Sequence, residues 1–247
     1  MRVNDESMFV LHCRDYGETS LLVELFARAH GRMGAIAKGA RKKRSKRGAV
    51  LDLFQPTLAS WSGKGELVTL TSVEAEGDPV VLEGEALFCG FYINELLLKL
   101  LHRFDPHEML FDYYALALKG LKDGDHESTL RIFEKRLLTE LGYGPVLDHD
   151  VKHHNLINGD SDYIYVLEKG PVRLDNNEND GIRIKGSSLL ALENEKLDDA
   201  LARHEIKRLM RSLIAHQLGD KPVHSRELLK ALRRNSNQSQ LNGVSSG

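Results

Sequence analysis

Short apolar runs separated by turn residues fill the first 75 residues, and their spacing limits the fold more than any other feature of the sequence. Turn residues recur about every 8–12 positions, which is typical of small antiparallel β domains. The runs predicted as strands are Ser7–Arg14, Ser20–Ala27, Met33–Ala37, Leu53–Trp61 and Glu66–Val73. Pro56 indicates an edge or a bulge in the fourth run. Five short strands in so few residues favour a small closed β-barrel over an open sheet.

After Asp78-Pro79 the apolar spacing changes to that of helices. The predicted helices are Gly84–Arg103, His107–Lys122, His126–Leu141, Ser187–Asn194, Glu205–Leu218 and Ser225–Arg233. Residues 146–183 look irregular, with room for one hairpin that pairs Tyr163–Leu167 with Val172–Leu174. We therefore predict an α+β chain with a barrel domain at 1–80, a mainly helical domain at 81–234 and a disordered tail at 235–247.

The net charge of −2 results from 34 basic and 36 acidic residues that are strongly segregated along the chain. Nine basic residues and no acidic one lie between Glu24 and Asp52. Residues 52–200 carry 14 basic and 28 acidic side chains, whereas residues 201–234 carry nine basic and three acidic ones. The near-zero total excludes a protein defined by bulk charge, whereas the separation of the charges along the chain suggests an anionic partner.

The cysteine and hydropathy patterns point to the cytoplasm. Cys13 and Cys89 are 76 residues apart and supply neither a disulfide framework nor a thiolate zinc site, so a reducing compartment is expected. No run of about 18 apolar residues is present, and we expect no membrane span.

A basic loop between Gly39 and Gly48 is the strongest candidate binding element. Clustered cations with a glycine at each end suit phosphate contacts, which tolerate variable geometry and are independent of sequence. A solvated loop without a partner and a nuclear-localisation segment remain alternatives. The predicted nucleic-acid-binding residues of this region are Lys38, Arg41, Lys42, Lys43, Arg44, Lys46 and Arg47.

A small barrel with a basic loop is typical of the oligonucleotide-binding (OB) fold, in which aromatic side chains stack on bases. The aromatic candidates in the barrel are Phe9, Tyr16, Phe26, Phe54 and Trp61. Most should fill the core of so small a barrel. Tyr16 and Trp61 are next to turn residues, which makes these two the best candidates for exposure among the five.

Several motifs, in order and with consistent spacing, resemble the RecO family of recombination mediators over about residues 7–232. They are Val10-Leu11-x-x-Arg14-x-x-x-Glu18-Thr19-Ser20, Gly31 with Lys38-Gly39-Ala40-Arg41, Tyr92–Leu97, Phe133–Tyr143 and Lys221–Leu228. Many members of that family carry a four-cysteine zinc motif in the helical domain. This chain has no cysteine after Cys89, so it resembles the zinc-less subgroup. We interpret His149, His153 and His154 as an exposed cluster rather than a metal site.

The resemblance implies a non-catalytic protein without cofactors. Members of the family bind single- and double-stranded DNA, anneal complementary strands, and engage single-stranded-DNA-binding protein (SSB). With RecR they help to load RecA during recombinational repair, which implies association with the bacterial nucleoid. The sequence contains no recognisable catalytic triad, paired-carboxylate motif or nucleotide-binding loop, in agreement with that expectation.

The acidic, apolar-ended tail of SSB would need an apolar pocket with a cation at its rim. Arg131 lies beside apolar positions of a predicted helix, with Lys135 one turn later. The predicted walls of this pocket are Leu110, Phe111 and Tyr114. The alternative is that Arg131 pairs with Glu127 or Glu134 on its own helix.

A second basic region is predicted in the helix Glu205–Leu218, where Lys207, Arg208 and Arg211 could contact DNA. These cations could equally neutralise the acidic middle of the chain. Two other functions also remain open. One is an OB-fold RNA-binding protein, because phosphate contacts do not distinguish the two sugars. The other is a metal-dependent nuclease that uses carboxylates of the acidic segment.

Overall fold

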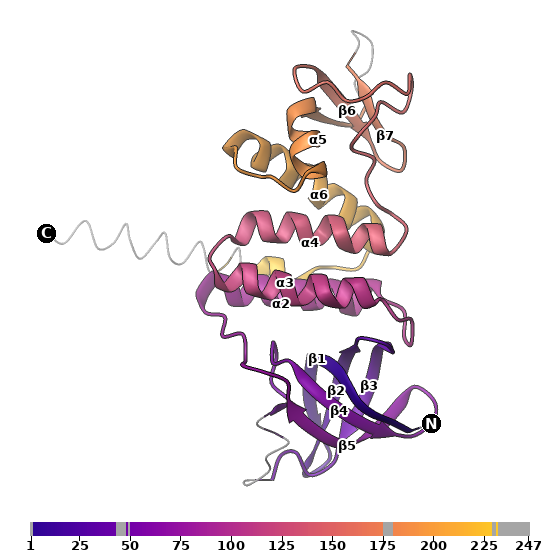
Figure 1. The fold of residues 1–247 in the computed structure, drawn as a ribbon, viewed down its shortest axis with the longest axis vertical. Coiled ribbons are helices and arrows are strands. Elements are labelled where there is room, and N and C mark those ends of the chain that lie inside the picture. The colour runs from indigo at the N-terminus through magenta and orange to yellow at the C-terminus, as the bar shows by residue number, and fades with distance from the viewer. Residues whose placement is uncertain (1, 43–47, 49, 175–179, 229–230, 232–247) are drawn as a thin grey trace, which may run out of the picture. The chain divides into compact units, whose positions relative to one another are not determined.

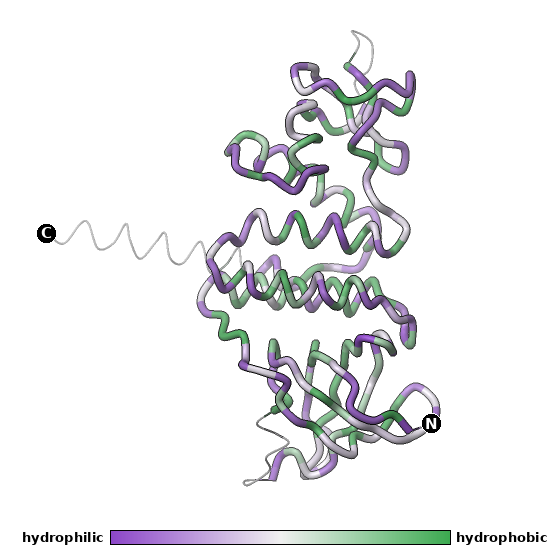
Figure 2. Tube along the Cα trace, in the orientation of Figure 1, coloured by the Kyte–Doolittle hydropathy of each residue, from purple (hydrophilic) through white to green (hydrophobic). Residues whose placement is uncertain are grey.

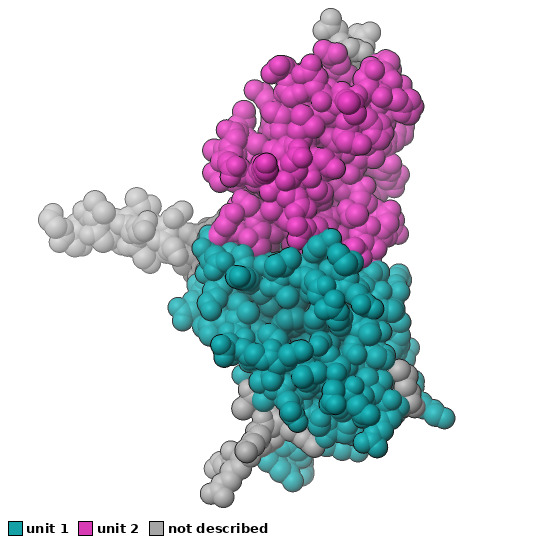
Figure 3. Space-filling model, viewed as in Figure 1, with its two compact units in different colours: residues 1–124, 221–247 teal, residues 125–220 magenta. Residues whose placement is uncertain are grey.

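A computed structural model describes residues 2–42, 48, 50–174, 180–228 and 231 (Figure 1). The chain divides into two compact units, of which unit 1 holds residues 1–124 and 221–247 and unit 2 holds residues 125–220 (Figure 3). The first two helices after the barrel pack within unit 1. Whether residues 1–80 fold as an independent domain remains a prediction.

The N-terminal half of unit 1 is the predicted five-stranded closed barrel of the OB type. Its strands are β1 (Arg2–Tyr16), β2 (Ser20–Ala27), β3 (Gly31–Ala37), β4 (Thr57–Ser62) and β5 (Leu67–Ala75). Around the barrel they follow the order β1-β2-β3-β5-β4. The β3–β5 pair is parallel and the other pairs are antiparallel. Closure leaves no open sheet edge, which protects a small sheet from unwanted pairing.

Alternation of side chains along the strands fills the barrel interior, and it buries Trp61. Trp61 is two residues after Ala59 on β4, and each is only 1% exposed. Trp61, one of the two candidates for exposure, therefore belongs to the core, because it lies on the inward face of β4 although it is close to the turn. Tyr16 is 47% exposed, as predicted, while Phe9, Phe26 and Phe54 are buried.

Strands β1 and β2 are also covered on their outer face, by helices α2 (Gly84–Leu100) and α3 (Glu108–Lys122). The Phe9 ring lies 5.2 Å from that of Phe111 and 4.9 Å from that of Tyr114, and the Phe26 ring lies 5.5 Å from Phe111. This aromatic layer joins the barrel to its helices. Apolar residues on both faces explain why the second predicted strand, Ser20–Ala27, alternates poorly.

A buried hydrogen-bond chain crosses the same interface. The register of β1 against β2 shifts between Val10 and His12, at the position of Leu11. The Asn94 side-chain amide of α2 donates to the Leu11 carbonyl at 3.0 Å, and its oxygen accepts from the Tyr114 hydroxyl at 2.7 Å. Burial raises the pKa of Tyr114, so this hydroxyl stays protonated and remains a donor.

The C-terminal segment returns to unit 1 and is fixed by Glu95 of α2. One carboxylate oxygen of Glu95 accepts from the His224 amide at 2.9 Å, and the other accepts from the amide and hydroxyl of Ser225 at 2.8 and 2.6 Å. Residues 224–228 are helical, so this carboxylate binds amides at the start of a helix, where negative charge is favoured. Nearby, Arg226 donates to the Tyr92 hydroxyl at 2.6 Å.

Unit 2 combines helices α4 (His126–Glu140), α5 (Gly186–Glu193) and α6 (Ala200–Leu218) with a three-stranded sheet. Figure 2 shows polar and apolar segments alternating along α4, as expected for a helix with one buried face. The sheet has the order β7-β6-β8, with β6 (Asp162–Val166), β7 (Gly170–Arg173) and β8 (Ile182–Lys185). The predicted hairpin is confirmed as β6–β7. Strand β8 was not predicted, because four residues bordered by turn-forming side chains give almost no alternation.

The Glu95 contacts predict a specific loss of stability in acid. Burial opposes ionisation, but the donors from Ser225, His224 and Lys99 prevail and lower the pKa of Glu95 to about 2. Because the folded-state pKa lies below the unfolded value of about 4.3, the stabilisation is present above pH 4.3 and is lost as the pH falls towards 2. Urea unfolding across this range should show a smaller decline for Glu95→Gln than for the wild type.

The Ser225→Ala variant removes one of these donors and should raise the pKa of Glu95. The acid decline should then begin at higher pH than in the wild type. Identical pH profiles for wild type and both variants would contradict this role of Glu95.

Candidate nucleic-acid interface

The start of the basic loop is anchored to the β1–β2 turn by Arg41. The guanidinium of Arg41 lies 2.7 Å from a carboxylate oxygen of Asp15 and donates to the Gly17 carbonyl at 3.2 Å. The Arg41 amide also donates to the Thr19 carbonyl at 3.0 Å. Arg41 therefore positions the start of the loop, and its guanidinium is already paired with a carboxylate.

Lys38 and Lys42 lie on either side of this anchor and are exposed. Within the described part of the chain, neither has an ion pair, so both are open to an anion. The Lys42 amide donates to the Gly39 carbonyl in a tight turn that needs the positive φ of Gly39, 71°. The other predicted loop residues, Lys43, Arg44, Lys46 and Arg47, lie outside the described residues.

Two further cations of the acid-free stretch serve the structure of unit 1. Arg28 makes a two-pronged contact with Asp112 of α3, at 2.8 and 2.9 Å. Arg32 donates to the Leu98 carbonyl of α2 at 2.6 Å, and burial lowers its pKa. These cations fix the barrel to its helices, so counting charges along the sequence overstates the number that could face a ligand.

The second predicted basic region contains at least one cation bound internally. Lys207 of α6 forms an ion pair with Glu127 of α4. Burial opposes ionisation of Glu127, but Arg131 and Lys207 outweigh it and lower the pKa of this carboxyl. Arg208 donates to the Arg183 carbonyl, and the charge of Arg211 also acts on Glu127. Lys207 therefore neutralises an acidic residue of unit 2, as the alternative interpretation of this basic region predicts.

Arg131 pairs with Glu127 and Glu134 of its own helix, which was the alternative to partner binding in the sequence analysis. Its side chain is 4% exposed, and its guanidinium lies 3.3 Å from Glu127 and 2.9 Å from the fully buried Glu134. Lys135, one turn later, donates to the Leu192 and Glu193 carbonyls at 3.1 and 2.7 Å, at the negative end of α5. Both cations proposed for partner binding therefore hold unit 2 together.

The three predicted pocket walls lie in the interior of unit 1. Leu110 and Tyr114 are 0% exposed and Phe111 is 7% exposed. The rings of Phe111 and Tyr114 cover Phe9 of the barrel. In this conformation they present almost no surface to a peptide, and their part in partner binding remains a prediction.

The histidine cluster of unit 2 is organised by carboxylates. His149 Nδ1 lies 2.7 Å from Asp148, and the rings of His149 and His154 stack with centroids 6.2 Å apart. Asp150 accepts from the backbone amides of Lys152 and Arg173 at 2.7 and 2.8 Å. In the described residues, no three histidine, cysteine, aspartate or glutamate side chains are placed to hold one metal ion.

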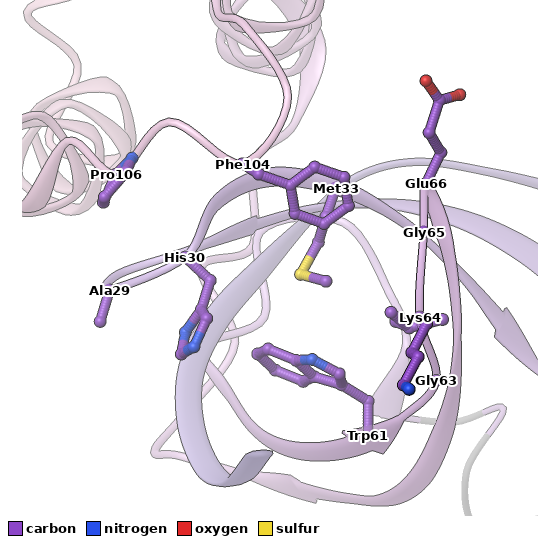
Figure 4. A pocket seen from close by; sticks show the side chains of 11 residues that line it. Ala29, His30, Met33, Trp61, Gly63, Lys64, Gly65, Glu66, Phe104 and Pro106 are labelled. Atoms are coloured by element: carbon purple, nitrogen blue, oxygen red, sulfur yellow. The ribbon is translucent and has the colours of Figure 1, made fainter. Parts of the chain in front are cut away.

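A cavity of about 560 Å³ at one end of the barrel escaped the sequence analysis (Figure 4). Its lining includes His30, Trp61, Lys64 and Phe104. The only sequence signal near this cavity was the pair of glycines on either side of Lys64, and these glycines indicated a turn and not a cavity. Phe104 follows a helix in the chain, so its place at the barrel end could not be read from local pattern.

The buried ion pair predicts a large effect of Arg131 on stability. Arg131→Met should lower the free energy of unfolding by about 3–5 kcal/mol, because it removes the guanidinium beside a buried carboxylate. Adding Glu134→Gln should restore much of this loss, since the buried charge is then absent. Urea denaturation of the two single variants and the double variant measures the coupling. Strictly additive effects would contradict the pairing.

Comparison with known proteins gives consistent matches along the whole chain. Residues 1–77 match the family model described as "Recombination protein O N terminal", and residues 82–227 match "Recombination protein O C terminal". The chain is 48% identical to a protein named "DNA repair protein RecO" from Nitrosococcus oceani, over 97% of this chain and 98% of that one. Proteins of the same name from Dechloromonas aromatica and Coxiella burnetii are each 46% identical, over 94% and 92% of this chain and 97% and 98% of theirs. The chain belongs to the RecO family.

Proposed function

We propose that this protein is a non-catalytic mediator of DNA repair by homologous recombination. In this proposal it binds single- and double-stranded DNA, anneals complementary strands and engages SSB. With RecR it promotes the loading of RecA at the bacterial nucleoid. The observation that carries the proposal is an OB-type barrel with unpaired, exposed lysines at the base of its basic loop, in a chain of the RecO family.

The charge arrangement supports a local binding surface on unit 1. Lys38 and Lys42 flank Arg41, which fixes the loop base, whereas Arg28 and Arg32 are bound to the helices. A phosphate backbone that approaches the loop therefore meets free cations beside a rigid support. Phosphate contacts of this kind make affinity strongly dependent on salt and nearly independent of sequence.

Two lysine pairs allow a matched test of the DNA surface. Lys38→Ala/Lys42→Ala removes two exposed charges at the loop base, and Lys119→Ala/Lys122→Ala removes two exposed charges on α3. We expect the first pair to weaken binding of single-stranded DNA and to reduce the log–log salt slope by about 1.4, or about 0.7 for each lost phosphate contact. Fluorescence anisotropy at several salt concentrations measures both quantities.

The α3 pair should leave affinity and slope near the wild-type values. Equal effects of the two pairs would mean that only net charge matters, and would contradict a binding surface at the loop. Replacing Lys42, Lys43, Arg44, Lys46 and Arg47 together by alanine should have a still larger effect. Competition between single-stranded DNA and RNA tests the RNA-binding alternative, and incubation of labelled DNA with magnesium or manganese tests the nuclease alternative.

We also propose that the SSB tail is recognised by the helical region around Arg131. What supports this proposal is a guanidinium next to the buried apolar residues Leu130 and Phe133 of α4. Because Arg131 already contacts Glu127 and Glu134, a tail carboxylate would have to compete with both.

The double variant Arg131→Met/Glu134→Gln separates recognition from folding, since the charges of the buried pair are both removed. It should bind an acidic SSB-tail peptide at least tenfold more weakly than Glu134→Gln alone, as measured by calorimetry. DNA binding should be the same for the two variants. Equal peptide affinities would rule Arg131 out as the recognition residue.

A further inference from the structure

The cavity of about 560 Å³ lies at the barrel end formed by the β2–β3 and β4–β5 turns (Figure 4). The strand register places this end away from the basic loop, because Tyr16 pairs with Ser20 at the loop end and Arg2 pairs with Ser62 at the cavity end. Its volume falls in the range of about 300–1,000 Å³ that is typical of small-ligand sites. The cavity is therefore separate from the phosphate-binding surface proposed above.

The lining is largely apolar and rich in ring systems. Figure 4 shows the side chains of His30, Met33, Trp61 and Phe104 converging on the cavity. Trp61 is 1% exposed and forms the floor, with its ring edge-on to His30 at 5.2 Å. Phe104 is 43% exposed at the mouth, so its ring is available to a ligand.

The backbone of Phe104 is held in an unfavourable conformation. Its φ of 58° lies in the left-handed region, which is unfavourable for a bulky side chain. The Phe104 amide donates to the Arg32 carbonyl at 2.9 Å, which ties this segment to β3. Gly31 permits the approach, since a Cβ there would lie 2.0 Å from the Asp105 carbonyl oxygen. The fold thus holds an exposed aromatic ring in a strained position over the cavity.

Lys64 supplies a cation at the rim. It lies between Gly63 and Gly65 in the β4–β5 turn, and both glycines have positive φ. Across the described ranges no ion pair engages Lys64. The other charged lining residue is Glu66, whose carboxylate points away from the cavity in Figure 4. A ligand in the cavity would therefore meet rings inside and positive charge at the edge.

We propose that this cavity binds one unstacked base of a single-stranded nucleic acid, with Phe104 stacking on the base and Lys64 contacting an adjacent phosphate. Bases combine a flat apolar face with a neighbouring negative charge, which is the combination that this site complements. The β4–β5 turn of an OB barrel is also one of the loops that contact oligonucleotides in this fold. The inference rests on the proposed function, since it assigns a base-binding site to the same DNA-binding protein.

A pair of oligonucleotides that differ only in their bases tests the proposal. A thymidine oligonucleotide and an abasic one of equal length carry the same phosphates. Wild type should bind the thymidine strand about tenfold more tightly, and Phe104→Ala should lose most of this preference with little change in abasic binding. Phe104→Tyr keeps the ring and should keep the preference. Tyr143→Ala, which removes another exposed aromatic ring, is the control and should behave as wild type.

Lys64→Ala should weaken binding of both strands and lower the salt slope by about 0.7. Trp61 is the only tryptophan of the chain, so its fluorescence should respond to the thymidine strand and not to the abasic strand. Equal affinity for the two strands in wild type, or an unchanged preference in Phe104→Ala, would overturn the base site and would indicate a cavity for another ligand, such as a protein side chain. Failure of both strands to bind would instead overturn the proposed function.

Discussion

The hydrogen-bond chain from Leu11 through Asn94 to Tyr114 is the contact on which the architecture of unit 1 depends. An irregularity in β1 places the Leu11 carbonyl where the helices cover the barrel, and a buried carbonyl without a donor would cost about 1–3 kcal/mol. The Asn94 amide nitrogen supplies the donor, and the Asn94 amide oxygen accepts from the Tyr114 hydroxyl. The polar chain fixes the position of the helices on the barrel, while the rings of Phe9, Phe26 and Phe111 add apolar contacts around it.

Many charged side chains of this protein bind other groups of the same chain and not a ligand. Arg28 and Arg32 attach helices to the barrel, Arg131 and Lys207 surround Glu127, and Lys135 caps a helix end. Among the described residues, the cations that remain exposed and unpaired are fewer than the sequence suggests. Their positions matter more than their number, because an anion responds to a local potential, and the net charge of −2 contains no information about that potential.

Local patterns predicted most of the fold. Ser20–Ala27 has the predicted bounds, and the order of the five strands and the main helices follows from periodicity and turn residues. What the sequence could not provide depends on contacts between distant segments. Trp61 is buried because of the strand face it occupies, and β8 exists only because β6 lies beside it. The cavity is lined by Lys64 and Phe104, which are 40 positions apart in the sequence. For Arg131 the sequence allowed both an ion pair on its own helix and partner binding, and the structure shows the ion pair.

Unit 2 interrupts unit 1 in the sequence, since the chain leaves after Gly124 and returns at Lys221. This connectivity has a consequence for biosynthesis. The Glu95 carboxylate emerges from the ribosome some 130 residues before Ser225, its donor. During translation the first unit therefore lacks this contact until Ser225 has been synthesised. An unfolded insertion would oppose this contact through the entropy of closing a long loop, so folding of unit 2 favours completion of the first unit.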